Sequence, residues 1–471
     1  MTAVSKTNSK ALQLIQQCAH RLRANTPADY DPILAAIGDA RVVMIGEASH
    51  GTHEFYVHRA EITKRLIQEK GFTIIACEAD WPPAYQVNRW VKEMSSSSKL
   101  KDANDALMDF TRFPVWMWRN TVVLDFISWL RTYNESKNEN KSKVGFFGID
   151  LYSLQSSREE VLNYLEKVDP EMAKQARKSY GCFERYSDEQ EYGYCAATKL
   201  SCGCEKEAID VLKKMLERHA KTVADNRSSE TEIEESFYAT ENAKIVREAE
   251  KYYRHMFEGG EITWNIRDTH MVDCLQDLLK YCGPEAKAVV WAHNSHVGDA
   301  RETDARRARE VNIGQLVRER FGLGKTFNIG FTTYTGTVTA ADSWDMDPDF
   351  KRVRPSLPES VEYLLHDALT RDSTLMNDGQ YFLLFRSNNP SVQISKDLHT
   401  ELHRKRLERA IGVIYRPRTE RQSHYLEANL STQFDCVIHV GITRALRPLE
   451  IHSAWSQAEK DHVPDTFPMN V

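Results

Sequence analysis

Three short stretches of this sequence place ionisable side chains directly after apolar runs, where buried strands would end. Their carboxylates and imidazoles are Glu47 and His50 in the stretch 46–52, Glu78 in 76–80, and His293 and His296 in 291–296. Open α/β sheets form ligand sites at the carboxyl ends of their strands, and buried charges there must be paired or used. The placement of these side chains therefore indicates an enzyme site assembled from separate strand ends.

A helix expected over 52–70, with Gly71 as its stop, adds an arginine to this set. Helical spacing places Arg59 on the same face as Phe55, Ile62 and Leu66, so Arg59 is predicted to be buried. A buried guanidinium needs carboxylate partners, and the nearest in topology are Glu47 and Glu78. The alternative is an ion cluster that only holds this βαβ unit together.

Apolar runs that alternate with helical patterns predict the fold class. It is an α/β protein with a mainly parallel central sheet flanked by helices and a helical insertion that covers the active-site edge. The expected strands are 41–46, 72–76, 143–149, 287–291, 326–331 and 434–440. The expected parts are 1–152 as the first part of the core, 153–271 as the insertion, and 272–471 as the second part of the core.

Composition narrows the class of protein without identifying its chemistry. The chain has 471 residues, 41% of them hydrophobic, and a net charge of −6, which offers no basic field for nucleic acid. No stretch has the length and apolarity of a membrane span. Nine scattered cysteines without a zinc-binding pattern predict a reduced, cytoplasmic protein. The expected partner is a small-molecule substrate, and the oligomeric state stays open.

Cofactor binding is constrained by both motifs and charge. The sequence contains no phosphate-binding loop and no G-x-G-x-x-G motif, so no nucleotide cofactor is expected. Glu47, His50, Glu78, His293 and His296 are all suitable ligands for a divalent ion. Arg59 among the carboxylates would already compensate their charge. We therefore predict no metal or other cofactor and keep a divalent metal as the alternative.

Several of these stretches together resemble the erythromycin esterase family. The resemblance rests on 46–55, Arg59, 76–82, 291–296 and 420–425, which span most of the chain. It implies hydrolysis of a macrolide lactone by an activated water, without a covalent acyl-enzyme, in a cleft between an α/β core and helical parts. It also implies that Glu47, His50, Arg59, Glu78, His293 and His296 are the functional positions.

We accordingly predict a hydrolase that cleaves an ester or lactone, with a macrolide or another polyketide lactone as the candidate substrate. His50 is the expected general base, and Glu47 orients it. Glu78 and Arg59 form a supporting ion pair in which Arg59 can also face the oxyanion. His293 and His296 position the substrate or act as the acid. The residues predicted to bind the substrate are Trp81, Trp116, Trp291 and His424.

Three other functions fit the same residues. The base could drive an intramolecular acyl transfer or cyclisation if the pocket excluded water. A metal ion could assist hydrolysis, or the protein could handle a metal or haem. A protein without catalytic activity could sequester an apolar ligand in a charged cleft.

Overall fold

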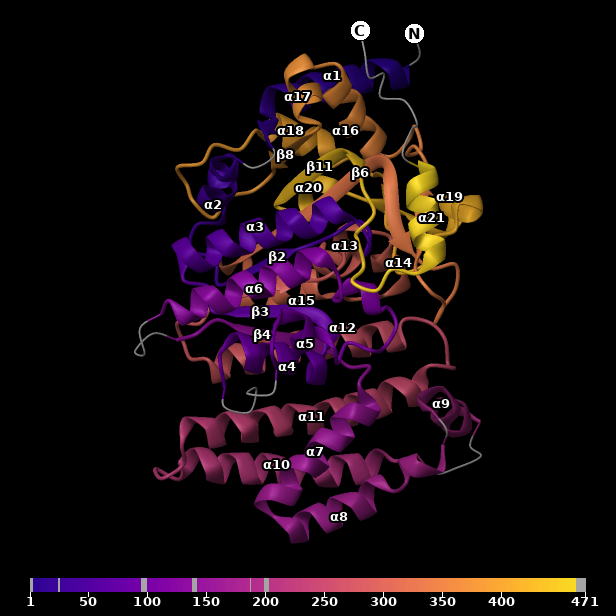
Figure 1. The fold of residues 1–471 in the computed structure, drawn as a ribbon. Helices are drawn as coiled ribbons and strands as arrows, with labels where there is room; N and C mark the ends of the chain where they lie inside the picture. Colours follow the sequence, from indigo (N-terminus) through magenta and orange to yellow (C-terminus); the bar gives the residue numbers. More distant parts are fainter. Residues whose placement is uncertain are drawn as a thin grey trace.

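A central β-sheet organises the computed structural model, which describes residues 3–23, 26–94, 100–137, 142–186, 188–198 and 203–462 (Figure 1). The strands are β1 (His20–Arg21), β2 (Val42–Ile45), β3 (Ile74–Asp80), β4 (Gly145–Asp150), β5 (Ala288–Trp291), β6 (Thr326–Ala340), β7 (Asp349–Val353), β8 (Gln380–Leu384), β9 (Arg406–Arg409), β10 (Tyr425–Ala428) and β11 (Cys436–Thr443). Within the described ranges, nine of them form one sheet in the order β1-β8-β11-β6-β2-β5-β3-β4, and β7 pairs with β6.

The strands from β11 to β4 run parallel to one another, which confirms the predicted mainly parallel sheet. Each of the six predicted runs overlaps one of these strands, and β3, β4, β6 and β11 extend beyond the predicted ends. The sequence patterns did not predict β1, β7 and β8, which pair antiparallel with their neighbours. They also missed the separate antiparallel pair of β9 and β10.

Helices cover both faces of this sheet. They are α1 (Ala3–Cys18), α2 (Asp31–Ile37), α3 (His53–Lys70), α4 (Trp81–Val91), α5 (Ala103–Leu107), α6 (Thr121–Glu135), α7 (Leu154–Val168), α8 (Pro170–Tyr180), α9 (Glu189–Ala197), α10 (Glu205–Ala224), α11 (Glu230–His255), α12 (Ile262–Tyr281), α13 (Asn294–Val297), α14 (Ala305–Ala308), α15 (Ile313–Phe321), α16 (Val361–Thr370), α17 (Ser373–Asp378), α18 (Lys396–Leu402), α19 (Glu420–Ser423), α20 (Leu430–Gln433) and α21 (Ser453–His462). Successive strand residues face opposite layers, so β2 sends Val43 into one core with α3 and α6, and Met44 into another with α12 and α15.

The first βαβ unit forms as its sequence predicts. Helix α3 begins at His53, ends at Lys70, and is closed by Gly71 in the left-handed conformation with φ of 71°. Only glycine adopts that conformation without steric cost, which explains the stop. The unit places the residues that follow β2 and those at the end of β3 at one edge of the sheet.

The predicted helical insertion is present as α7 to α12. Figure 1 shows α7, α8, α10 and α11 gathered beyond the β4 side of the sheet. These four helices bury their own apolar cluster, which includes Leu165, Ala176, Val211 and Val246. Helix α12 packs its residues Met271 and Leu275 into the core of the sheet, and Phe237 of α11 packs into the same core. These two helices therefore connect the insertion to the central sheet.

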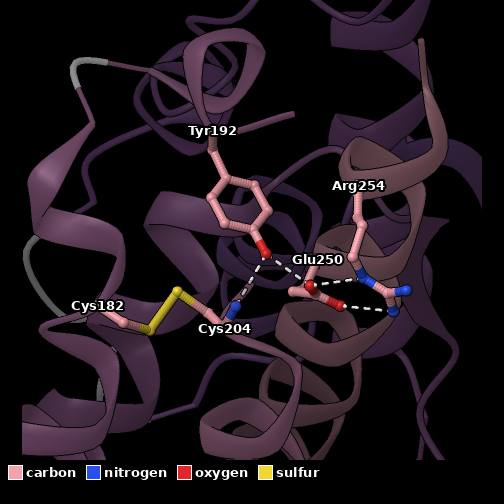
Figure 2. The surroundings of a disulfide bond; sticks show 5 residues. All are labelled: Cys182, Tyr192, Cys204, Glu250 and Arg254. Carbon is pink, nitrogen blue, oxygen red and sulfur yellow. Dashed lines mark hydrogen bonds and ion pairs between the residues drawn. A yellow bond between two sulfur atoms is a disulfide. The ribbon is translucent and has the colours of Figure 1, made fainter. Parts of the chain in front are cut away.

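A disulfide within the insertion corrects one prediction. Cys182 and Cys204 are covalently joined, so the expectation of a fully reduced protein is wrong (Figure 2). Beside the bond, the Tyr192 hydroxyl accepts the Cys204 backbone N–H at 3.0 Å and donates to the buried Glu250. Six other described cysteines are free thiols. Sequence spacing did not reveal the pair, because its two members are brought together by the packing of helices.

Among the helices of the described ranges, none is long and apolar enough to cross a membrane.

Candidate active site

The ends of three neighbouring strands bring the predicted chemical groups together. Glu47 follows β2, His293 follows β5, and Glu78 lies near the end of β3. Because these strands are adjacent and parallel, their carboxyl ends share one edge of the sheet. The ends of β5 and β3 are close enough to form a hydrogen bond, because the His293 backbone N–H donates to the Glu78 side-chain oxygen Oε2 at 2.9 Å.

His50 and Glu47 form a hydrogen-bonded pair at this edge. His50 Nδ1 lies 2.9 Å from Glu47 Oε1, and Glu47 is fully buried. A carboxylate partner assigns the proton to Nδ1, which leaves a lone pair on Nε2. His50 is 7% exposed and lines a cavity at this edge of the sheet. The pair thus holds an imidazole in the tautomer that a general base requires.

Arg59 contacts the glutamate of this pair. It is 1% exposed, as the helical spacing predicted, and its Nη2 lies 3.3 Å from Glu47 Oε1. Nη2 also donates to the Gly46 carbonyl at 3.0 Å. Burial raises the pKa of the Glu47 carboxyl, but the Arg59 charge and the His50 hydrogen bond outweigh burial, so this pKa lies below its ordinary value. Glu47 is therefore a carboxylate at neutral pH.

The predicted ion pair between Arg59 and Glu78 is wrong. Arg59 contacts Glu47 instead and does not line the cavity, so it does not face a bound substrate there. Glu78 pairs with Arg267 of α12, whose Nη2 lies 2.7 Å from Glu78 Oε1. The same Nη2 lies 2.7 Å from Asp150 Oδ2 at the end of β4. Each buried glutamate thus has its own arginine.

His296 lies in a strongly charged environment. Its Nδ1 is 2.9 Å from Asp268 Oδ1, its Nε2 is 3.3 Å from Glu78 Oε1, and Trp264 stacks on its ring at 4.6 Å. Burial lowers the pKa of His296, but Asp268 and Glu78 outweigh it and raise this pKa to about 9. Arg267 Nη1 lies 3.1 Å from Nε2, and both groups reach the same Glu78 oxygen. His296 is an imidazolium at neutral pH.

His293 has the opposite protonation state. Burial and the nearby His50 ring, at a centroid distance of 4.8 Å, lower its pKa to about 3. Its Nδ1 accepts the Ser295 backbone N–H at 3.2 Å, so the proton resides on Nε2. That buried N–H has no hydrogen-bond partner in the described part of the chain. It is a neutral donor next to His50.

A cavity of about 800 Å³ opens beside these groups. The sheet edge contributes His50, Glu78 and His293 to its wall. The insertion contributes Ser156 and Glu159 from α7 and Arg267 from α12, among others. This volume falls within the range of small-molecule sites. The insertion therefore shapes the site, as the predicted fold requires.

The four residues predicted to bind substrate lie outside this cavity. Trp81 and Trp291 are buried in the two cores beside the sheet, and Trp116 lines a neighbouring cavity. His424 is not a wall residue of this cavity, and its side chain accepts the Arg416 backbone N–H at 3.1 Å. The aromatic walls of the main cavity include Trp118, Trp264 and Trp344. Residue type alone did not distinguish a core tryptophan from one on a cavity wall.

Sequence reasoning also missed Arg267, Asp268 and Asp150. Asp150 carried a usable signal, because it ends an apolar run that was predicted to be a strand, at the same edge as Glu78. Arg267 and Asp268 lie on a helix, in a segment without a recognisable motif. In the described ranges, no three histidine, cysteine, aspartate or glutamate side chains are arranged to hold a metal ion together.

Replacing Arg59 with leucine is expected to destabilise the fold by about 3 to 5 kcal/mol, since Glu47 would remain buried without its cation. Arg65→Leu is the matched control on α3, because the partners of Arg65, Asp31 and Glu69, are 62% and 46% exposed. That change should cost no more than about 1 kcal/mol. Urea titrations measure both free energies of unfolding, and equal small losses would contradict the pairing of Arg59 with Glu47.

The charge on His296 should also make stability depend on pH. Because its pKa is raised to about 9, its contribution is complete below its ordinary pKa and is lost as the pH rises through about 9. Asp268→Asn removes the main cause of the rise. Between about pH 7.5 and about pH 10, wild type should therefore lose more free energy of unfolding than Asp268→Asn, by roughly 1 to 2 kcal/mol. Equal losses in urea titrations would show that His296 is neutral.

Comparisons with known proteins identify the family and the fold. The chain is 22% identical over 435 residues to the erythromycin esterase type I of Escherichia coli, covering 88% of this chain and 93% of that protein. A Bacillus cereus protein of known structure has a TM-score of 0.71 at 18% identity, covering 94% of this chain and 99% of that one. A solved erythromycin esterase variant, EreC in its open conformation, has a TM-score of 0.61 at 14% identity, covering 92% and 100%. The sequence profile of the erythromycin esterase family matches residues 67–443, and the chain belongs to that family.

Proposed function

We propose that this protein hydrolyses an ester or lactone with a water molecule activated by His50. The observation that carries the proposal is the Glu47–His50 pair at the cavity wall, 2.9 Å between Oε1 and Nδ1. Glu47 holds the ring and stabilises the imidazolium that forms when Nε2 takes a proton from water. The water oxygen then attacks the carbonyl carbon, and the proton on His50 passes to the leaving alkoxide.

The oxyanion that forms in this attack needs hydrogen-bond donors, and two histidines supply candidates. His293 offers a neutral Nε2–H that has no partner in the described part of the chain. His296 is an imidazolium whose positive charge faces the same cavity. Fixed donors and charges in a site of low dielectric stabilise a developing negative charge more than water does. We assign the His293 Nε2–H as the hydrogen-bond donor to the carbonyl oxygen. We assign the His296 charge as electrostatic stabilisation of the oxyanion that forms there.

The substrate class follows from the family and from the size of the cavity. The relative named erythromycin esterase type I points to a macrolide lactone, and the 800 Å³ cavity accommodates a substrate of drug size. At 22% identity the macrolide itself is one candidate within the wider class of esters and lactones.

Changing His50 to glutamine should lower kcat by at least ~100-fold while the protein remains folded, the loss expected when a general base is removed. His53→Gln is the matched control, because His53 begins α3 three residues further on and does not line the cavity. Its kcat should stay within about twofold of wild type, because His53 takes no part in proton transfer. Mass spectrometry of a panel of lactones and esters provides the readout. Turnover by His50→Gln close to that of wild type would remove His50 from the mechanism.

We also propose that the reaction needs no metal ion, on the basis of charge. Glu47 is paired with Arg59, and Glu78 is paired with Arg267 and His296. Carboxylates that already have cationic partners gain less from binding a divalent ion. Activity should therefore survive exhaustive dialysis against EDTA. Loss of activity followed by recovery with one particular divalent ion would contradict this proposal and assign Glu47 or the histidines as ligands.

A further inference from the structure

A second cavity of about 550 Å³ lies next to the catalytic one. The two cavities share Phe110, Thr111 and Phe113 as wall residues. The shared residues belong to the segment between α5 and α6, and the remaining walls of the second cavity come mainly from 345–348 and 448–452. The second cavity therefore adjoins the catalytic cavity at these three residues.

Two aromatic rings form the boundary between the cavities. Trp344 lines the catalytic cavity, Phe113 lines both, and their ring centroids are 4.9 Å apart. Trp344 lies in the connection between β6 and β7, and the residues directly after it, Asp345 and Met346, line the second cavity. A ligand bound at His50 that extends past these rings would enter the second cavity.

Large apolar side chains are exposed on the walls of both cavities. Met108 is 51% exposed, Trp344 is 50% exposed and Met346 is 52% exposed. A concentration of exposed apolar side chains around a concave surface is typical of a ligand site. The buried Trp116, which sequence reasoning assigned to substrate binding, completes the apolar wall of the second cavity.

The charges of the second cavity disfavour an anionic ligand. Its arginine, Arg119, donates to Glu450 at 3.1 Å and is already neutralised. Its other acidic wall residues, Asp345 and Asp347, are exposed to solvent, and Asp347 Oδ1 lies 3.6 Å from Nε2 of the wall residue His452. An uncharged apolar chain fits these walls better than a chain that ends in a carboxylate or phosphate.

We infer that the second cavity is a subsite for the distal, uncharged apolar part of the acyl group of a substrate whose ester carbonyl lies at His50. This inference rests on the proposed ester hydrolysis. It adds a specificity for long, neutral acyl groups over short ones. Met346 is then a residue that determines specificity, and it lies outside the groups assigned to proton transfer.

The test compares p-nitrophenyl acetate with p-nitrophenyl octanoate. Wild type should have a kcat/KM at least ~10-fold higher for the octanoate, because its chain becomes buried in the subsite. Met346→Asp should remove most of that preference while its kcat/KM for the acetate stays within about twofold of wild type, because the added charge disfavours only the long chain. Met376→Asp is the matched control, because Met376 is 58% exposed on α17 and lines neither cavity.

Binding of the neutral fluorescent probe N-phenyl-1-naphthylamine tests the subsite without any turnover. Met346→Asp should weaken binding at least ~5-fold relative to Met376→Asp, because the carboxylate faces an apolar ligand. If both esters are cleaved in a His50-dependent way at equal kcat/KM, or if both aspartate variants behave alike, the subsite is wrong and the hydrolase stands. If neither ester is cleaved, ester hydrolysis loses its support and probe binding alone decides the subsite.

Discussion

Compensation of two buried carboxylates by two arginines is the constraint on which the site depends. Glu47 and Glu78 are 0% and 7% exposed, and an isolated ionised carboxylate at such a depth would lose several kcal/mol of hydration. Ion pairs offset that loss, with Arg59 Nη2 at 3.3 Å from Glu47 Oε1 and Arg267 Nη2 at 2.7 Å from Glu78 Oε1. With these cations in place both glutamates stay ionised, so Glu47 can orient His50 and Glu78 can hold the loop after β5 through the His293 N–H.

The two arginines come from different parts of the chain, and this difference explains the architecture. Arg59 lies on α3, inside the same βαβ unit as both glutamates. Arg267 lies on α12, which connects the insertion to the central sheet, and it is separated from Glu78 by 189 residues. The insertion therefore contributes a counter-ion as well as a cavity wall. Any displacement of α12 would leave Glu78 and Asp150 buried with less positive charge nearby.

The sequence was sufficient wherever the controlling interaction is local. Local sequence determines the six predicted strands, the ends of α3 including its stop at Gly71, and the burial of Arg59. Each depends on neighbours within one strand or within one or two helical turns. The ion-pair partner of Glu78 was not predictable in the same way. Arg59 lies in the same βαβ unit as Glu78, but Glu78 pairs with Arg267, which is distant in the sequence. The antiparallel β8 had a signal in the apolar residues Tyr381 to Leu384, but so short an apolar run does not by periodicity alone distinguish a strand from a buried helix segment.

The histidines show how a single sequence motif supplies two protonation states. His293 and His296 are three residues apart, yet the pKa of the first is lowered to about 3 and that of the second is raised to about 9. His293 is buried beside another imidazole, whereas His296 lies between Asp268 and Glu78. A neutral donor and a fixed cation are thus available in the same cavity at neutral pH. Because Asp268 comes from α12, the helix that compensates Glu78 also sets the charge of the histidine beside it.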